Sequence, residues 1–213
     1  MKSKKTFMIG VLSLCAFVAW TLLVRVVDVA AIGPRGSSVG FSNLNRFVHK
    51  LTGTNMTLYT MTDWLGLVPI AVALGFAILG LVQWIKRKSI FAVDRSILTL
   101  GGFYTVVIAV YVLFEFVVVN YRPVLIEGYL EASYPSSTTM LVACVMPTAI
   151  MQLRDRIKNP TVKKTVFVFI SAFIAFMVIG RIISGVHWIS DIIGGVLLSV
   201  GLVSVYYSLA HKK

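Results

Sequence analysis

The sequence has little charge: only 13% of its 213 residues are Asp, Glu, Lys or Arg, whereas 58% are hydrophobic. The mean hydropathy is +0.89. Such a composition leaves too little polar surface for a soluble domain and predicts a polytopic membrane protein. The length fits one compact unit rather than several, so we expect a single membrane domain over residues 1–213.

Negative charge is scarcest, with 8 Asp and Glu residues against 20 Lys and Arg, which gives a formal net charge of +12. In a soluble protein this excess would indicate a nucleic-acid partner. Here the basic residues lie in short clusters between apolar runs, so membrane topology accounts for most of the excess and we expect no nucleic acid. A residual attraction to anionic headgroups makes membrane lipids the expected partners.

Cysteine is nearly absent, and Cys15 and Cys144 each lie inside an apolar run. We therefore expect both to be small buried residues, and we expect no disulfide. The sequence also shows no internal repeat and no low-complexity tract. The first apolar run is long and lacks a convincing small-residue cleavage site, so we expect no cleaved signal peptide.

Long apolar runs dominate the chain, and a membrane-spanning helix requires about 20 such residues. The pattern predicts an all-α fold with six transmembrane helices, over residues 6–24, 65–85, 97–121, 136–153, 165–184 and 187–210. Between the first two, residues 41–51 carry Phe41, Leu44, Phe47 and Val48 at helical spacing, with basic residues on the other side. This segment predicts a short interfacial helix.

Most of the Lys and Arg residues lie at the chain start, between the second and third predicted spans, between the fourth and fifth, and at the chain end. The predicted spans put these four clusters on one side of the membrane. Because basic residues favour the cytoplasmic side, we expect a multi-pass protein of the plasma membrane with both termini cytoplasmic. Arg122, the segment at Pro135 and His187 then fall together on the outer side.

Ionisable residues interrupt the apolar pattern near the C-terminus, where Arg181, His187 and Asp191 follow one another closely. Charged groups at the edge of a membrane span are costly and tend to mark function. His187 and Asp191 are four residues apart, so on a helix they share a face. Asp191 can then accept the Nδ1–H of the imidazole and leave Nε2 free to attack an electrophile. The planar guanidinium of Arg181 suits a phosphate.

Two further segments bring polar residues to the same side. Residues 120–123, which include Arg122, leave the third predicted span, and residues 134–139 enter the fourth. Pro135 is favourable at a helix start. The free N–H groups and the hydroxyls that follow it predict an anion site, made by Ser136, Ser137 and Thr138.

Together these segments resemble the signature of the type 2 phosphatidic acid phosphatase superfamily of integral membrane lipid phosphatases. That signature contains a Lys before an Arg-Pro pair, then Pro-Ser-Gly-His, then a Ser-Arg pair followed by a His and an Asp. The Arg-Pro pair is matched at 122–123 and the Pro-Ser pair at 135–136. Arg181, His187 and Asp191 match the third part at its spacing. The order of the motifs and the six predicted spans extend the resemblance over the whole chain.

The resemblance implies a reaction and a role for each matched residue. His187 would attack phosphorus and form a phosphohistidine, while Asp191 orients and charges the ring. Arg122 and Arg181 would hold the phosphate oxygens as their negative charge redistributes in the transition state. The reaction needs no metal and no other cofactor.

Three positions depart from the signature: Glu115 stands at the Lys position, Gly180 at the Ser position, and Thr138 at the His that protonates the leaving oxygen. We expect Glu115 to be a buried partner of an arginine. General acid catalysis is worth about 10²–10⁴-fold. Loss of the His therefore favours a diphosphate substrate, whose leaving group needs little protonation, or a proton donor elsewhere. Glu127 and Glu131 lie on the outer side and are candidates for that donor.

The sequence thus predicts a membrane lipid phosphatase that acts on a phosphomonoester or a diphosphate at the outer membrane face. Phosphatidate, phosphatidylglycerophosphate and polyprenyl diphosphate are the candidate substrates. The alternative from another class is a catalytically degenerate relative that binds lipid phosphates or partners without hydrolysis. A small-anion transporter is a third hypothesis, disfavoured because the cytoplasmic half of the predicted spans carries few polar residues.

Overall fold

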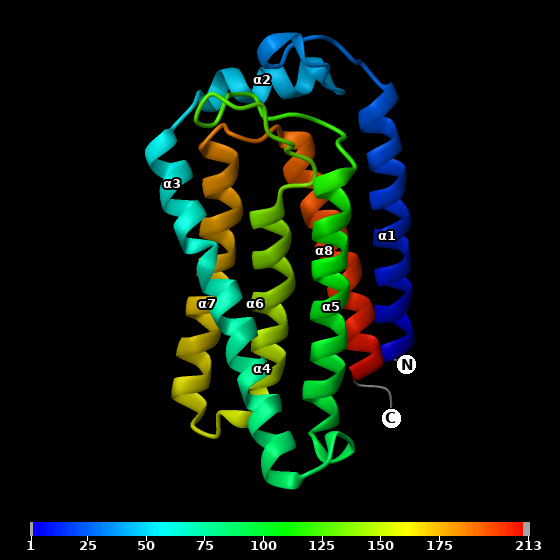
Figure 1. The fold of residues 1–213 in the computed structure, drawn as a ribbon, viewed down its shortest axis with the longest axis vertical. Helices are drawn as coiled ribbons and strands as arrows, with labels where there is room; N and C mark the ends of the chain where they lie inside the picture. Colours follow the sequence, from blue (N-terminus) through cyan, green and yellow to red (C-terminus); the bar gives the residue numbers. More distant parts are fainter. Residues whose placement is uncertain (1, 211–213) are drawn as a thin grey trace.

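The computed structural model of the chain describes residues 2–210, which fold into a bundle of helices (Figure 1). For this part of the chain the all-α prediction is confirmed. The long helices are α1 (Lys2–Val26), α4 (Leu67–Arg87), α5 (Arg95–Phe116), α6 (Ser137–Arg156), α7 (Pro160–Ile183) and α8 (Ile189–Ala210). The shorter elements are α2 (Ser42–Thr52), α3 (Met56–Leu65) and the 3₁₀ turns η1 (Pro34–Gly36) and η2 (Ile90–Ala92).

Within residues 2–210, 5 segments are long and apolar enough to cross a membrane: Ser3–Val26, Met56–Arg87, Arg95–Phe116, Pro160–Ile183 and Ile189–Ala210. They correspond to all but one of the predicted spans. The second begins earlier than expected, because α3 leads into α4 with only Gly66 between them. The third ends earlier, since the chain leaves the helix at Phe116 rather than at Tyr121.

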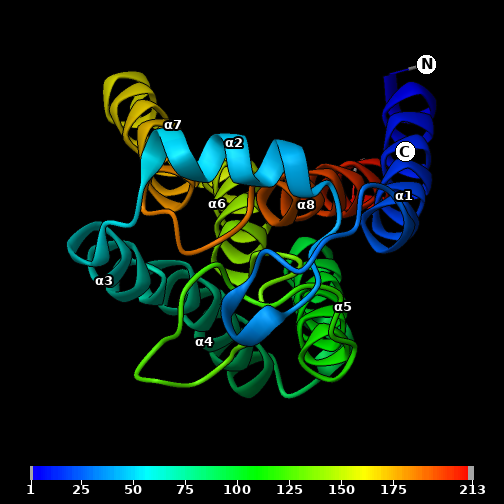
Figure 2. The ribbon, with the colours of Figure 1, turned by 90° about the horizontal axis from the view of Figure 1, so that it is seen from above.

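Helix α6 covers the remaining predicted span, 136–153, but is not among these apolar segments. It packs against α4, α5, α7 and α8 inside the bundle (Figures 1 and 2). Polar side chains lie between these helices: Thr148 Oγ1 is 3.1 Å from the Tyr104 hydroxyl, and Gln152 Nε2 donates to the Tyr206 hydroxyl at 2.9 Å. A helix enclosed by other helices can carry such residues, which accounts for its lower hydropathy. That α6 also crosses the membrane, which would make six spans, stays a prediction.

Close packing joins α1 to α8, because small residues lie where the two backbones approach. A Cβ atom on Gly10 would lie 2.8 Å from Val205 Cγ2, and one on Gly201 would lie 2.7 Å from Leu14 Cδ2. Small residues at helix crossings are a common means of packing helices within membranes. The beginning of α1 and the end of α8 therefore lie side by side at one end of the bundle (Figure 1).

The two cysteines differ in burial. Cys144 on α6 is buried, as expected, whereas Cys15 is exposed, contrary to expectation. The reason is that α1 lies at the edge of the bundle (Figure 2), so one of its faces has no protein neighbour. Both residues are free thiols.

Helix α2 lies across the opposite end of the bundle, together with the α5–α6 connection and the α7–α8 turn (Figure 1). Its inward side is polar: Asn45 Nδ2 donates to Ser190 Oγ at 3.0 Å, and Asn45 Oδ1 accepts from the Ser190 N–H at 3.1 Å. Leu44, Phe47 and Leu51 are exposed. A helix thus forms where the sequence predicted one, over residues 42–52 instead of 41–51; its place at the membrane interface stays a prediction.

Gly201→Ala tests the packing of α1 on α8. The added methyl group would lie 2.7 Å from Leu14, so we expect the free energy of unfolding to fall by about 1–3 kcal/mol, the usual effect of overpacking. The matched control is Gly75→Ala on α4, where nothing lies within 4 Å of an added Cβ. Alanine is the better helix former there, so stability should stay equal or rise by up to about 1 kcal/mol. Thermal unfolding in detergent measures both; a Gly201→Ala variant as stable as wild type contradicts the close packing.

Candidate active site

The turn between α7 and α8 carries His187 and is fixed by its neighbours. Gly185 has a φ of +65°, and a Cβ there would collide with the backbone of Gly53, so only glycine fits. The Ser184 carbonyl accepts a hydrogen bond from the Asn55 N–H at 2.9 Å. In this setting the His187 residue is only 5% exposed.

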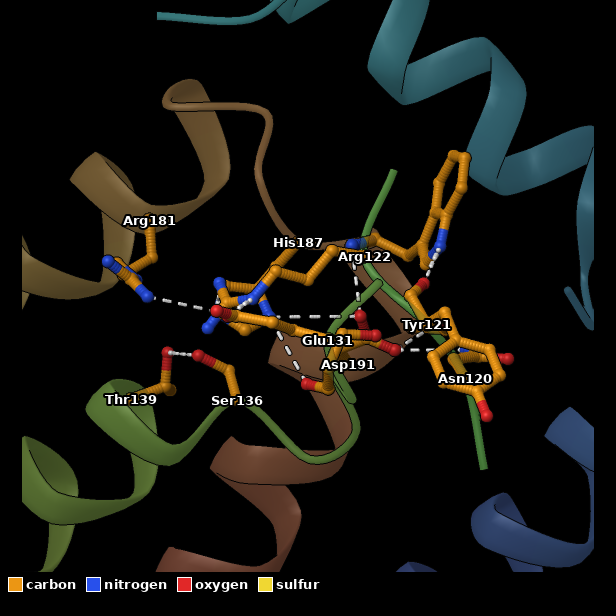
Figure 3. Close-up of polar contacts among 12 residues, drawn as sticks. Asn120, Tyr121, Arg122, Glu131, Ser136, Thr139, Arg181, His187 and Asp191 are labelled. Carbon is orange, nitrogen blue, oxygen red and sulfur yellow. Dashed lines mark hydrogen bonds and ion pairs between the residues drawn. The ribbon is translucent and has the colours of Figure 1, made fainter. Parts of the chain in front are cut away.

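Two guanidinium groups meet at one nitrogen of His187 (Figure 3). Arg122 Nη1 lies 3.1 Å from Nε2, and Arg181 Nη2 lies 3.0 Å from it. A guanidinium can only donate, so Nε2 is the acceptor and Nδ1 carries the proton. That proton is donated to the Ser133 carbonyl oxygen, 3.1 Å from Nδ1. The lone pair of the imidazole is therefore directed at the two arginines.

Asp191 lies beside the ring but does not take the hydrogen bond that the sequence predicted for it. Its Oδ2 is 3.8 Å from His187 Nδ1, because the Ser133 carbonyl occupies that position. The carboxylate is instead held by the Trp188 N–H, 3.0 Å from Oδ2, and by the Asn120 amide, 3.0 Å from Oδ1 (Figure 3). It is fully buried at the start of α8, and these hydrogen bonds hold it beside the imidazole.

Each arginine also has an acidic partner. Arg122 Nε lies 2.9 Å from Glu131 Oε2, and Arg181 Nη1 lies 3.6 Å from Asp63 Oδ1. The ring of Tyr59 packs against both cations, with its centroid 5.7 Å from Arg122 Cζ and 4.9 Å from Arg181 Cζ. A carboxylate and an aromatic face both attract a cation. These contacts offset the repulsion between two positive charges that share one neighbour.

Arg122 is positioned by a short hairpin, residues 120–133, in the connection between α5 and α6. The Arg122 N–H donates to the Glu131 carbonyl at 3.0 Å, and the Ser133 N–H donates to the Asn120 carbonyl at 2.9 Å. This pairing places the Arg122 and Glu131 side chains together and brings the Ser133 carbonyl and the Asn120 amide to the site. Arg181, by contrast, stands on the last turn of α7 and is 1% exposed.

Two hollows adjoin at this end of the bundle. The first, here called the polar cavity, has a volume of about 620 Å³; its ionisable lining includes Tyr59, Asp63, Glu115, Arg122, Glu131 and His187. The second, the apolar cleft, has a volume of about 800 Å³ and is lined mostly by apolar side chains of α4, α5 and α6. Asp63, Tyr111 and Ser137 line both hollows. A molecule with a charged head and an apolar tail matches this arrangement.

Of the three residues predicted to form an anion site, only Ser137 lines the polar cavity. Ser136 is buried, and its hydroxyl accepts from Thr139 Oγ1 at 3.0 Å (Figure 3). Thr138 lines the apolar cleft instead. The difference arises because these residues begin helix α6, where successive side chains point to different sides. Ser137 and His187 therefore line the same cavity, and Thr138 lines the neighbouring cleft.

The acidic residues of the α5–α6 region also differ from expectation. Glu115 is exposed and lines the polar cavity, so it is not the buried arginine partner that we expected; Glu131 pairs with Arg122 in its place. Glu127 is exposed on the hairpin and lines neither hollow. Within residues 2–210, no three His, Cys, Asp or Glu side chains are grouped to hold a metal ion.

Sequence reasoning missed Tyr59 and Asp63, which reach the site from α3. A signal for them is present: the two residues are four apart and directly precede an apolar run, so a helix places them on one face. The second span is predicted to begin only at residue 65, so the residues before it, including those of α3, fall in the predicted connection on the outer side. Their helical spacing was therefore not considered.

Comparisons with known proteins agree with this architecture. A family model described as the PAP2 superfamily matches residues 70–213. The chain is also similar to the crystal structure of the first transmembrane PAP2 type phosphatidylglycerolphosphate phosphatase from Bacillus subtilis, with a TM-score of 0.57, 21% sequence identity and 94% of each chain covered. At that identity the likeness concerns the fold. No curated protein sequence matches the chain.

His187, in the turn outside the candidate spans, offers a test of this charge arrangement. Burial, then the charges of Arg122 and Arg181, hold its pKa well below the ordinary value of 6.5, against the raising effect of the Ser133 carbonyl. Because the pKa in the folded protein is depressed, the ring stays neutral as the pH falls through 6.5 and gains a proton only at lower pH.

We expect Arg122→Gln to raise the pH at which His187 titrates, since it removes one nearby cation. Histidine NMR in detergent micelles measures this, with the resonance assigned by its loss in His187→Gln. Arg35→Gln is the control, because Arg35 donates to the Gly128 carbonyl on the hairpin and makes no contact with the imidazole. Titration of His187 at or above pH 6.5 in the wild type would show that the two arginines do not approach the ring as described.

Proposed function

Since the chain belongs to the PAP2 superfamily, we propose that it is a membrane lipid phosphatase that hydrolyses a phosphate ester or a diphosphate through a phosphohistidine on His187. The observation that carries the proposal is the meeting of Arg122 and Arg181 at Nε2 of His187, at 3.1 and 3.0 Å. Two forked donors around a lone pair make a place for a phosphate next to a nucleophile.

The proposed reaction has two steps. A bound phosphate draws the guanidinium N–H groups of Arg122 and Arg181 onto its oxygens, which releases the Nε2 lone pair of His187 to attack phosphorus. The bond from phosphorus to the leaving oxygen breaks, and the lipid alcohol or lipid monophosphate departs with that electron pair. The buried carboxylate of Asp191 balances the positive charge that the ring then acquires. Water afterwards cleaves the phosphorus–nitrogen bond and restores the neutral imidazole. The arginines act most strongly as charge moves onto the phosphate oxygens.

A lipid substrate fits the two adjoining hollows. The polar cavity is lined by Arg122 and His187, and the apolar cleft offers side chains of α4, α5 and α6 to a hydrocarbon tail. The tail moves from the bilayer into an apolar cleft, so its packing against these side chains, and not removal from water, holds it there. Phosphatidate, phosphatidylglycerophosphate and polyprenyl diphosphate are the candidate substrates. All steps use side chains of this chain, so the proposal includes no metal ion and no other cofactor.

The proposal also includes a topology. Helix α6 is the sixth span, enclosed by the others, and α2 lies in the outer interface with Leu44, Phe47 and Leu51 toward lipid. The basic α4–α5 and α6–α7 connections lie at the end of the bundle opposite the candidate site (Figure 1). By the positive-inside rule, both termini are cytoplasmic in the plasma membrane and the site faces outward.

A catalytically degenerate relative is the second candidate. It is favoured by one observation: Thr138, which stands where the family signature has its second histidine, lines the apolar cleft and not the polar cavity. Such a protein would bind lipid phosphates between Arg122 and Arg181 without cleaving them.

Phosphate release by the wild-type protein separates the two candidates, and His187→Ala tests the nucleophile. We expect purified wild-type protein to release phosphate from at least one of the three candidate lipids with a chelator present, and His187→Ala to release none. Asp191→Asn should leave a trace of activity, because the ring keeps its Ser133 hydrogen bond but loses the adjacent charge. Phosphate release by colorimetric assay, with thermal stability recorded for each variant, is the measurement. Undiminished release by a folded His187→Ala protein would exclude this residue as the nucleophile.

The topology is tested by two cysteine substitutions in a Cys15→Ser background. We expect a membrane-impermeant maleimide to label Glu127→Cys in intact cells, because residue 127 is exposed on the hairpin beside the site. Lys88→Cys, exposed between α4 and α5 at the other end, should react only after permeabilisation. Cys144 can remain, since it is buried. Labelling in the reverse pattern would place the site on the cytoplasmic side.

A further inference from the structure

We propose that Asp63 is the general acid of this site, the group that protonates the oxygen through which the phosphate leaves its lipid. The inference rests on the proposed function. It concerns a residue on α3, which lies before the residues 70–213 that the family model matches.

The position of the leaving oxygen narrows the choice of acid. That atom joins the phosphate to the lipid, so it lies where the polar cavity meets the apolar cleft. Three side chains line both hollows: Asp63, Tyr111 and Ser137. A phenol, with a pKa of about 10, and an aliphatic hydroxyl are poor proton donors near neutrality, whereas a carboxyl group can serve once negative charge is placed beside it.

Arg181 links this carboxyl group to the nucleophile. One end of its guanidinium, Nη1, lies 3.6 Å from Asp63 Oδ1, and the other end, Nη2, lies 3.0 Å from His187 Nε2. A phosphate held by Arg181 therefore has His187 near one side and Asp63 near another. Displacement at phosphorus requires a nucleophile and, on the leaving oxygen, a proton donor, and these two residues supply one of each beside the same guanidinium.

Binding of the phosphate also prepares the acid. The Asp63 side chain is 56% exposed while that of Arg181 is 1% exposed, so the pair is loose on the carboxyl side. A phosphate that engages Arg181 weakens its hold on Asp63 and brings negative charge next to the carboxyl group. Both changes release the carboxyl group from Arg181, so that it can contact the leaving oxygen.

The other carboxyl groups of the polar cavity are less suitable. Glu131 Oε2 lies 2.9 Å from Arg122 Nε and lines the polar cavity but not the apolar cleft, so it is engaged away from the junction. Glu115 lines the polar cavity but not the apolar cleft, so it does not reach the junction. Asp63 is thus the carboxyl group at the junction that has a loose partner.

The proposed reaction begins at His187 and ends with the acid restored. Nε2 of His187 gives its lone pair to phosphorus, the bond from phosphorus to the leaving oxygen breaks, and that oxygen keeps the electron pair and takes the proton of Asp63. The products are the lipid alcohol or lipid monophosphate, the phosphohistidine and the Asp63 carboxylate. Water then attacks phosphorus, the phosphorus–nitrogen electrons return to Nε2, and Asp63 takes the proton of the water. Inorganic phosphate leaves and the acid is restored.

A pair of substrates with one tail distinguishes an acid from a residue that only neutralises Arg181. Farnesyl monophosphate leaves an alkoxide, which needs a proton, whereas farnesyl diphosphate leaves a phosphate, which needs little help. We expect Asp63→Asn to lower kcat/KM on the monophosphate by about 10²–10⁴-fold and on the diphosphate by less than about 10-fold. Asp63→Glu keeps the carboxyl group and should restore part of the activity on the monophosphate.

The controls separate this inference from the proposed function. Glu127→Gln removes an exposed carboxyl group that lines neither hollow and should leave both rates unchanged. Glu131→Gln, which disturbs Arg122, should lower both rates by similar factors. An equal loss on both substrates in Asp63→Asn, or no loss, overturns the role of Asp63 while the phosphatase proposal stands. Loss of both activities in His187→Ala supports that proposal, and their persistence there defeats it whatever Asp63 does.

Discussion

The site depends on two arginines that share one acceptor. Placing two guanidinium groups within 3.1 Å of the same buried imidazole nitrogen brings like charges together where water is scarce, and this is costly unless anions or other partners compensate. Compensation comes from Glu131 on the hairpin and from Asp63 and Tyr59 on α3. The two arginines of the hairpin and α7 therefore depend on the acidic and aromatic side chains that the hairpin and α3 bring to them. A bound phosphate would add further negative charge beside both guanidinium groups.

The local part of this arrangement could be predicted from the sequence. Arg181, His187 and Asp191 lie close in the chain, and the end of α7, the Gly185 turn and the start of α8 fix their relation without distant contacts. The predictions that were wrong or incomplete concern contacts between segments that lie far apart in the sequence. A backbone carbonyl such as that of Ser133, which takes the Nδ1 hydrogen bond expected of Asp191, has no signature in side-chain patterns. Asp63 was missed because α3 was assigned to a connection.

The hydropathy of the sequence predicted most of the long helices of the bundle. It was least informative for α6, the helix enclosed by the others. Helix α6 packs against four other long helices, so its Thr and Gln side chains find partners inside the protein instead of lipid. The start of this helix also decides which side chains reach the site. Ser137 lines both hollows, and Thr138 lines the apolar cleft alone. Thr138, which departs from the family signature, thus lies outside the polar cavity, whose acidic lining is Asp63, Glu115 and Glu131.

The most direct test of the central claim is whether phosphate becomes bound to His187 during turnover. A substrate labelled with ³²P in the transferred phosphate is mixed with the protein and quenched in alkali, which preserves phosphohistidine, and the labelled peptide is identified after proteolysis. The account predicts label on the peptide that contains His187, and its absence in the His187→Ala protein. Label on another side chain, or turnover under single-turnover conditions with no labelled protein at any time, would contradict it.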